Sequence, residues 1–174
     1  ARIHAIETDD ERYLNAIISL NPLAVDAARA ADDQRKAGKA VPPDSLFGLP
    51  ILLKDNVGFE GLPTTAGAAA LAANYTRDAF VTERLKANGV IILGKANLSE
   101  WAYFFCTGCP SGYSALGGQT LNPYGRLAFN TGGSSAGSGA AIAGGFAVAA
   151  VGSETSGSIL SPSSANSLVG LKPT

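Results

Sequence analysis

The segment from Thr131 to Thr174 constrains the fold most, because much of it is built from residues with little or no side chain. It opens with a Gly-Gly-Ser-Ser turn, continues through a small-residue stretch and an apolar run, and reaches a second serine-bearing turn at residues 156–158. Residues without bulk let one backbone approach another backbone, or a ligand, closely. The two serine-bearing turns therefore bracket one helix and one strand, and a close approach is the expected reason for this composition.

Composition and charge exclude several classes of protein. The chain has 174 residues, of which 46% are hydrophobic and 16% are charged, as expected for one globular domain. A net charge of -1 provides no electrostatic attraction for nucleic acid or for an anionic membrane. No apolar run approaches the roughly 20 residues that a membrane span requires, and no charged and then apolar leader precedes Tyr13. We expect neither a nucleic-acid partner nor a membrane partner, and the sequence indicates no compartment.

Strand and helix patterns alternate along the chain. The spacing of Leu14, Ile17 and Ile18 is typical of one helical stripe, whereas residues 51–54 form a short apolar run that ends in a lysine. Such alternation predicts an α/β architecture with a sheet flanked by helices. The expected strands cover residues 51–54, 90–94 and 146–151, and the expected helices cover residues 10–20, 21–37, 78–88 and the small-residue stretch after residue 133.

Two further segments have weaker patterns. Asn97, with Glu100 three residues later, resembles a capping box that opens a short helix. Residues 106–133 show no period, and loops of that length in a compact domain are usually functional or disordered. The glycine and proline turns within this segment favour an ordered loop.

Cys106 and Cys109 form a C-x-x-C pair, which could be half of a zinc site, a redox pair or a local disulfide. A structural zinc site needs four ligands, and the chain offers no other cysteine and only one histidine, His4. No βαβ context for a redox motif surrounds the pair. We interpret the two cysteines as a loop pair, either free or oxidised.

Residues 133–137 match G-x-S-x-G, the turn that carries the nucleophile in α/β hydrolases. Those enzymes place a histidine after the serine, but the only histidine here is His4. The same glycine-rich segment lacks the lysine of a P-loop, and its fit to a dinucleotide-binding fingerprint breaks at Ile142. An S-x-x-K motif is also absent, so none of these familiar assignments fits.

A neutral lysine can activate a serine where histidine is missing, and Lys54 is the candidate. A base that works near pH 7 to 8 needs a lysine pKa lowered by roughly three units, which burial behind an apolar strand could provide. Asp55 would favour the charged lysine unless its side chain points to the opposite face, as alternation along a strand predicts. The ordinary alternative for a single lysine is a solvated surface position.

Several blocks of sequence together resemble the amidase signature family, in that family's order, over about residues 14–174. Two carry the serines: Gly132-Gly-Ser-Ser-x-Gly-Ser and Gly152-Ser-Glu-Thr-x-Gly-Ser-Ile. The others are Gly48-Leu-Pro-Ile-Leu-Leu-Lys-Asp-Asn, Leu93-Gly-Lys-Ala-Asn-Leu-Ser-Glu-Trp and the closing Gly170-Leu-Lys-Pro-Thr. The resemblance implies a mixed β-sheet flanked by helices, and a hydrolase that uses no metal or organic cofactor.

The resemblance also implies site residues and a reaction. Lys54 corresponds to the base, Ser134 to a relay serine that follows a cis peptide bond, and Ser158 to the nucleophile that forms an acyl-serine with an amide substrate. Ser135 and Ser138 are expected only to bond at the start of a helix, and Ser153 only to serve a turn. The family's oxyanion hole maps onto the backbone N–H groups of Thr155, Ser156, Gly157 and Ser158.

Departures from the common family pattern suggest a subgroup. Glu154, Ser156 and Leu160 replace an aspartate, a glycine and an arginine, and this combination is similar to peptide amidases, which remove the C-terminal amide from peptides. The expected substrate is a small-molecule or peptide amide. Two alternatives stay open: a glutaminase resembling the A-type component of amidotransferases, and a catalytically silent binding or structural module on the same fold.

Length is the largest departure, because domains of this family are usually more than twice as long. We expect residues 1–174 to be the N-terminal part of a single amidase domain, cut at both ends. Its missing partner would then be the C-terminal half of the same domain.

Overall fold

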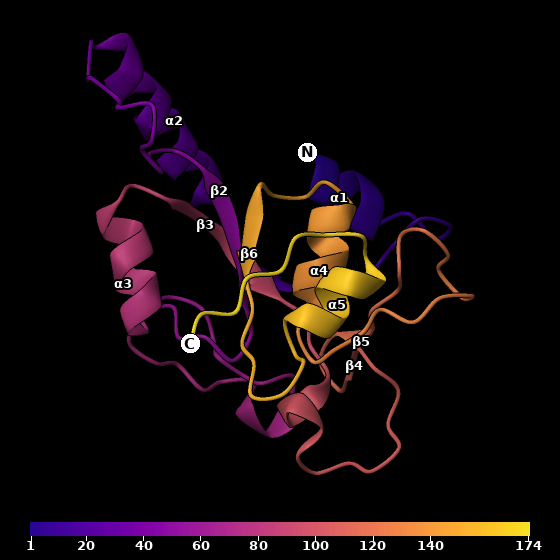
Figure 1. The fold of residues 1–174 in the computed structure, drawn as a ribbon. Helices are drawn as coiled ribbons and strands as arrows, with labels where there is room; N and C mark the ends of the chain where they lie inside the picture. Colours follow the sequence, from indigo (N-terminus) through magenta and orange to yellow (C-terminus); the bar gives the residue numbers. More distant parts are fainter.

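The computed structural model describes residues 1–174 and shows a four-stranded mixed sheet with helices on both sides (Figure 1). The strand order is β1-β3-β2-β6, in which β2 runs parallel to both β3 and β6, and β1 runs antiparallel to β3. The α/β class expected from the sequence is confirmed. The strands are β1 (Ile17–Leu20), β2 (Pro50–Lys54), β3 (Ile91–Ala96) and β6 (Ala149–Val151).

The helices pack on the sheet in two groups. Figure 1 shows α4 and α5 side by side, while α2 and α3 lie toward the other side of the strands. Helix α4 contacts β2, β3, β6 and α5, and α1 packs its isoleucines against the same core. None of the helices is long and apolar enough to cross a membrane. Their bounds are α1 (Arg2–Glu7), α2 (Ala24–Lys36), α3 (Phe80–Ala87), α4 (Ala136–Ala143) and α5 (Leu160–Ala165).

Strand β2 is buried on both faces, which explains its continuous apolar sequence. Leu52 packs into the core under α4, whereas Ile51 and Leu53 pack into a second core on the opposite face. Because side chains alternate along a strand, Lys54 follows Leu52 onto the α4 face. The sheet therefore delivers one lysine into the interior beside the small-residue helix.

Glycine lets α4 lie directly on the backbone of the sheet. The Gly137 N–H donates to the Asn97 carbonyl oxygen at 2.9 Å. A methyl group at position 137 would overlap the carbonyl oxygens of Ala16 and Asn97. This close approach was expected from the small residues of the segment, and it fixes the start of α4 next to β3.

The helix expected over residues 10–20 is wrong. Both oxygens of the Glu7 carboxylate accept backbone N–H groups, from Leu14 and Asn15 at 2.9 Å and from Ala16 at 2.8 Å. The following residues form β1 and bond to β3. Pairing with an existing strand edge outweighs a short helical stripe, because it buries the same apolar side chains and satisfies the backbone.

The capping box expected at Asn97 and Glu100 is also wrong. The buried Asn97 amide oxygen accepts from Leu98 N and from the Ser114 hydroxyl, while Glu100 accepts from Ala115 N. These two side chains therefore organise the following loop. The short segment after them is a 3-10 turn, η2 (Glu100–Tyr103), that includes left-handed residues, and a second 3-10 turn is η1 (Ala69–Leu71).

The loop over residues 106–133 is ordered, as its turn residues indicated. A small hairpin of β4 (Tyr113–Ser114) and β5 (Gly118–Gln119) lies at its centre. Cys106 and Cys109 are joined in a disulfide, so the structure shows the oxidised form of this loop pair.

Candidate active site

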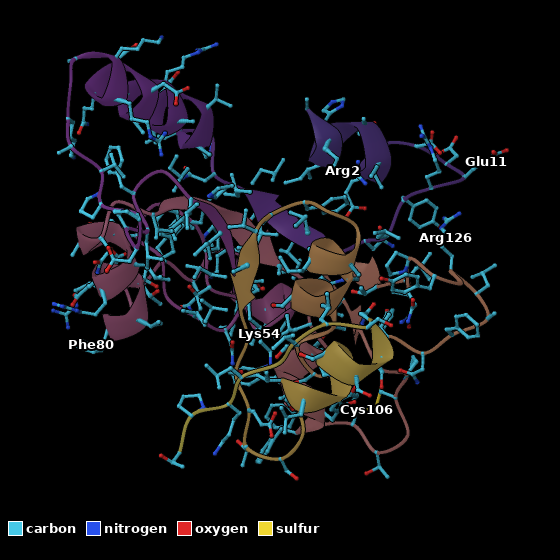
Figure 2. All side chains as sticks on the ribbon, turned by 45° about the horizontal axis from the view of Figure 1, so that its top comes forward. Arg2, Glu11, Lys54, Phe80, Cys106 and Arg126 are labelled. Atoms are coloured by element: carbon cyan, nitrogen blue, oxygen red, sulfur yellow. A yellow bond between two sulfur atoms is a disulfide. The ribbon has the colours of Figure 1, made fainter.

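Lys54 is fully buried at the end of β2, and Figure 2 shows it near the centre of the molecule. Its Nζ atom lies 2.7 Å from Ser134 Oγ, 2.9 Å from Ser153 Oγ and 3.3 Å from the Ser153 carbonyl oxygen. An ammonium group has three donors, and these three oxygens provide an acceptor for each. The amine is therefore held in one place by uncharged partners.

Burial lowers the pKa of Lys54 from 10.5 to about 8. The cause is desolvation, because removing the ammonium from water disfavours the charged form. Hydroxyl and carbonyl oxygens offset this effect less than a carboxylate would. A sizeable fraction of Lys54 is therefore neutral just above neutral pH and can accept a proton.

Ser134 is equally buried and follows a cis peptide bond at Gly133-Ser134, as the family resemblance implied. Its carbonyl oxygen accepts the N–H of Ser99 at 3.0 Å. A methyl group at position 133 would overlap the Tyr103 hydroxyl. The segment from Ser99 to Tyr103 thus supports the turn that presents the Ser134 hydroxyl to Lys54.

Asp55 points away from Lys54, as alternation along the strand predicted. Its Oδ1 atom lies 3.2 Å from Lys95 Nζ, and its Oδ2 atom accepts from the backbone N–H of Thr65 at 3.2 Å and from the Thr65 hydroxyl. Both charged side chains of this pair are fully buried. The carboxylate next to Lys54 in sequence therefore has a different cation as its partner.

Ser158 lies on the turn between β6 and α5. Its carbonyl oxygen accepts the N–H of Ser135 at 3.1 Å, which joins this turn to the start of α4. Gly157 adopts a left-handed conformation, with φ of 82°. No hydrogen bond joins the Ser158 and Ser134 hydroxyl groups in this structure. The two serines are therefore linked through the backbone at Ser135.

Glu154 holds the ends of the turn together. Its Oε2 atom accepts the backbone N–H of Ile159 at 2.6 Å and of Leu160 at 2.9 Å. These N–H groups lower the pKa of the Glu154 carboxyl below its ordinary value. The carboxylate thus closes a loop around residues 155–158, and it does so without the arginine found in many relatives of this pattern.

The four residues assigned to the oxyanion hole lie on that loop. The backbone N–H groups of Thr155, Ser156 and Ser158 donate no hydrogen bond within the protein, and that of Gly157 faces the Glu154 carboxylate. Thr155 and Ser156 are exposed, whereas Gly157 and Ser158 are partly buried. The loop therefore has free donors close to the Ser158 hydroxyl.

Three serines have roles that the sequence did not predict. Ser153 was expected to serve only a turn, yet its hydroxyl accepts from Lys54 Nζ and from Asn56 Nδ2 at 2.8 Å. Ser135 and Ser138 were expected to bond at the helix start, but their hydroxyls donate to the carbonyl oxygens of Ser153 and Val151. They therefore fasten the segment after β6 to α4. The parallel register of Leu53 with Val151, which places Ser153 beside Lys54, was the missing information.

Two hollows adjoin these residues. A cavity of about 890 Å³ runs along the free edge of β6 and includes Ser135, Ser153 and Ile159 in its wall. A smaller one of about 170 Å³ is lined by aromatic side chains, by Ser99 and by the disulfide. The structure contains no cluster of three or more histidine, cysteine, aspartate or glutamate side chains that could hold a metal ion.

Comparison with known proteins assigns this fold and site to a family. Residues 1–174 match the sequence model of the family described as Amidase. The chain therefore belongs to the amidase signature family, a family of hydrolases. It is similar to the peptide amidase of Stenotrophomonas maltophilia, with 46% identity and a TM-score of 0.92 over 99% of this chain and 35% of that structure.

Two curated relatives extend the comparison. A protein of Arabidopsis thaliana described as a probable amidase is 46% identical over 92% of this chain and 31% of its own length. The A-type component of the glutamyl-tRNA(Gln) amidotransferase of Cupriavidus metallidurans is 41% identical over 100% of this chain and 34% of its own. The chain thus spans about a third of the length of these relatives.

Proposed function

We propose that this protein hydrolyses a carbon–nitrogen amide bond through an acyl-serine intermediate, with Lys54, Ser134 and Ser158 as a triad. The observation that carries the proposal is the 2.7 Å hydrogen bond between Lys54 and Ser134, made by a buried lysine whose pKa lies at about 8. A lysine that can be neutral near physiological pH is a suitable general base for a serine hydroxyl.

In the proposed reaction, neutral Lys54 takes the proton of Ser134 while Ser134 takes that of Ser158. The Ser158 oxygen then bonds to the amide carbonyl carbon. When the C–N bond breaks, the proton returns through Ser134 to the leaving amine or ammonia, and water releases the acyl group by the same route. Hydrogen bonds in catalytic groups often tighten only with substrate bound, so the present distance between the two serines is compatible with this relay.

The free N–H groups on the Ser158 loop support the proposed oxyanion hole. A tetrahedral intermediate carries a negative oxygen beside the attacking serine, and donors already in place stabilise it without reorganisation. Removing one such donor typically costs about 3 kcal/mol of transition-state stabilisation. Thr155, Ser156, Gly157 and Ser158 provide these groups in our proposal, and the Glu154 carboxylate keeps their loop closed.

A C-terminal peptide amide is the proposed substrate. The similar peptide amidase structure has also been determined with the competitive inhibitor chymostatin, again with 46% identity to this chain. The aromatic hollow beside Ser99 offers an apolar surface close to the Ser134 turn. The likeness to the amidotransferase component favours a second candidate, hydrolysis of glutamine to supply ammonia to a partner.

We further propose that residues 1–174 form the N-terminal part of a single amidase domain. The relatives are about three times as long, and the large cavity along β6 borders an unpaired strand edge. The remaining part of such a domain would cover this edge and complete the substrate pocket.

A serine-directed fluorophosphonate tests the proposal in the full-length protein. We expect one covalent adduct, mapped to Ser158 by peptide mass spectrometry and absent from Ser158→Ala. Release of ammonia from a peptide amide but not from free glutamine would select the peptide amidase. An intact, folded protein that neither labels nor hydrolyses either compound would favour the silent module.

A further inference from the structure

Two buried lysines lie on neighbouring strands and face opposite sides of the sheet. In the parallel pairing of β2 with β3, Lys54 is opposite Ala96 and Leu53 is opposite Lys95. Both lysines are fully buried. Lys54 meets hydroxyl and carbonyl oxygens under α4, whereas Lys95 meets the Asp55 carboxylate on the other face. The same residue type thus has a neutral and a charged environment within one sheet.

The environment of Asp55 and Lys95 is built entirely inside the protein. Lys95 Nζ lies 3.2 Å from Asp55 Oδ1 and also donates to Thr64 Oγ1 at 3.1 Å and to the Pro63 carbonyl oxygen at 3.3 Å. Thr65 donates both its N–H and its hydroxyl to Asp55 Oδ2. A carboxylate with these donors and this cation is held in its charged form.

An unpaired carboxylate at position 55 would act on Lys54. Charges inside a protein interact over several ångströms with little screening, and a negative charge nearby favours the ammonium form of a lysine. Lys95 supplies an equal positive charge on the same face of the sheet as Asp55. The two charges therefore cancel at the Lys54 amine.

Other charged groups around Lys54 do not provide this cancellation. Helix α4, strand β6 and the turn at residues 131–135 carry no titratable side chain. On the loop after β6, the Glu154 carboxylate is bonded to the N–H groups of Ile159 and Leu160. In the segment after β3, Glu100 is bonded to Ala115 N. Asp55 and Lys95 are the buried charged pair in the two strands that hold the lysine.

We propose that Lys95 is a positioning residue for Lys54: its ion pair with Asp55 cancels the buried negative charge beside the amine and lets Lys54 lose its proton near neutral pH. This inference depends on the proposed function, in which Lys54 is the base. It assigns a role in the reaction to two side chains that do not contact the reacting atoms.

The test is made in the full-length protein with Lys95→Met, Asp55→Asn and the double variant. Lys95→Met leaves the carboxylate alone, so the pH at which Lys54 deprotonates should rise by roughly one unit. Asp55→Asn leaves the ammonium alone, so it should fall by a similar amount. The double variant removes both charges and should return toward the wild-type value.

Two readings are taken for each variant. One is the pH dependence of the rate at which a fluorophosphonate labels Ser158. The other is the titration of the ¹³Cε signal of Lys54, assigned by its loss in Lys54→Met. Lys86→Met is the matched control, because it breaks an exposed ion pair with Asp78 and should move neither reading. Circular dichroism establishes that each variant is folded.

Opposite shifts in the two single variants support the proposal, because a purely structural role would not invert its sign with the charge removed. Shifts in the same direction, or no shift, would overturn it. If Lys95→Met does not fold, Asp55→Asn decides: a downward shift supports the proposal and an unchanged value overturns it. A wild-type protein that does not label Ser158 would instead count against the proposed function, while the ¹³C titration still tests the charge effect.

Discussion

The Nζ atom of Lys54 lies 2.7 Å from the Oγ atom of Ser134, and neither side chain is exposed to solvent. This contact joins residues 80 positions apart, one at the end of a central strand and the other at the turn before α4. It depends on the absence of side chains in α4, which lets that helix lie against the sheet backbone. Packing of small residues thus produces the chemical environment of the lysine.

The three proposed triad residues should act as one unit. Replacing Lys54, Ser134 or Ser158 singly by alanine should reduce kcat/KM by several orders of magnitude, and each double variant should lose little more. The measurement is steady-state amide hydrolysis by the full-length variants. Near-normal turnover in Ser158→Ala would remove that residue from the mechanism, and fully additive losses would show that the three act independently.

Lys54 should reduce the stability of the protein below its own pKa. The pKa is 10.5 in the unfolded chain and about 8 in the folded protein, so the unfolded state binds more protons between these values. The full cost, about 3 kcal/mol before lost hydrogen bonds are considered, is present below pH 8 and vanishes as the pH rises to 10.5.

Lys54→Met should therefore be more stable than wild type toward urea at pH 7, and its advantage should shrink by pH 10. Urea unfolding at both pH values measures this difference, with Lys86→Met as a surface control. An advantage that is equal at the two pH values would show that the folded-state pKa of Lys54 is not lowered.

Close packing of α4 should be sensitive to a single methyl group. Gly137→Ala places that group against the carbonyl oxygens of Ala16 and Asn97, so we expect a loss of about 1 to 3 kcal/mol in the free energy of unfolding. Gly139→Ala is the matched control on the same helix. Its nearest neighbours would be Asn166 Nδ2 at 3.1 Å and Pro162 Cβ at 3.2 Å. Similar stability of the two variants in urea would contradict the packing argument.

The sequence predicted the sheet well where strands are apolar on both faces. The expected strand at residues 51–54 and those at 90–94 and 146–151 correspond to β2, β3 and β6, because a fully buried strand has few alternatives. The expected helix at 10–20 failed, since its stripe was short and the nearby Glu7 carboxylate binds the backbone that a helix would have used. Side-chain contacts from outside a segment are invisible to its own periodicity.

The candidate site was only partly predictable for the same reason. Lys54 and Ser134 follow from the motifs, and the structure places them in contact. Ser153 could not be assigned, because its proximity to Lys54 depends on the pairing register of β2 with β6. The assignments of Ser158 and of the oxyanion donors stay predictions.

Glu154 should matter for turnover through the shape of the Ser158 loop. Glu154→Gln weakens two charge-assisted bonds to Ile159 N and Leu160 N, so we expect kcat to fall by about 10- to 100-fold while KM changes less. Steady-state kinetics on the full-length protein measures both constants. Glu60→Gln is the control, because that exposed side chain makes no hydrogen bond. An unchanged kcat in Glu154→Gln would show that the carboxylate does not hold the loop for catalysis.

The central claim is that Lys54 is a neutral base above its lowered pKa, and the pH profile of kcat/KM tests it most directly. Protonated Lys54 cannot accept the Ser134 proton, so activity should rise from acid pH and level off above about pH 8. The residual activity of Lys54→Met should lack this limb. A limb of the same midpoint in Lys54→Met would contradict the account, because another group would then be titrating.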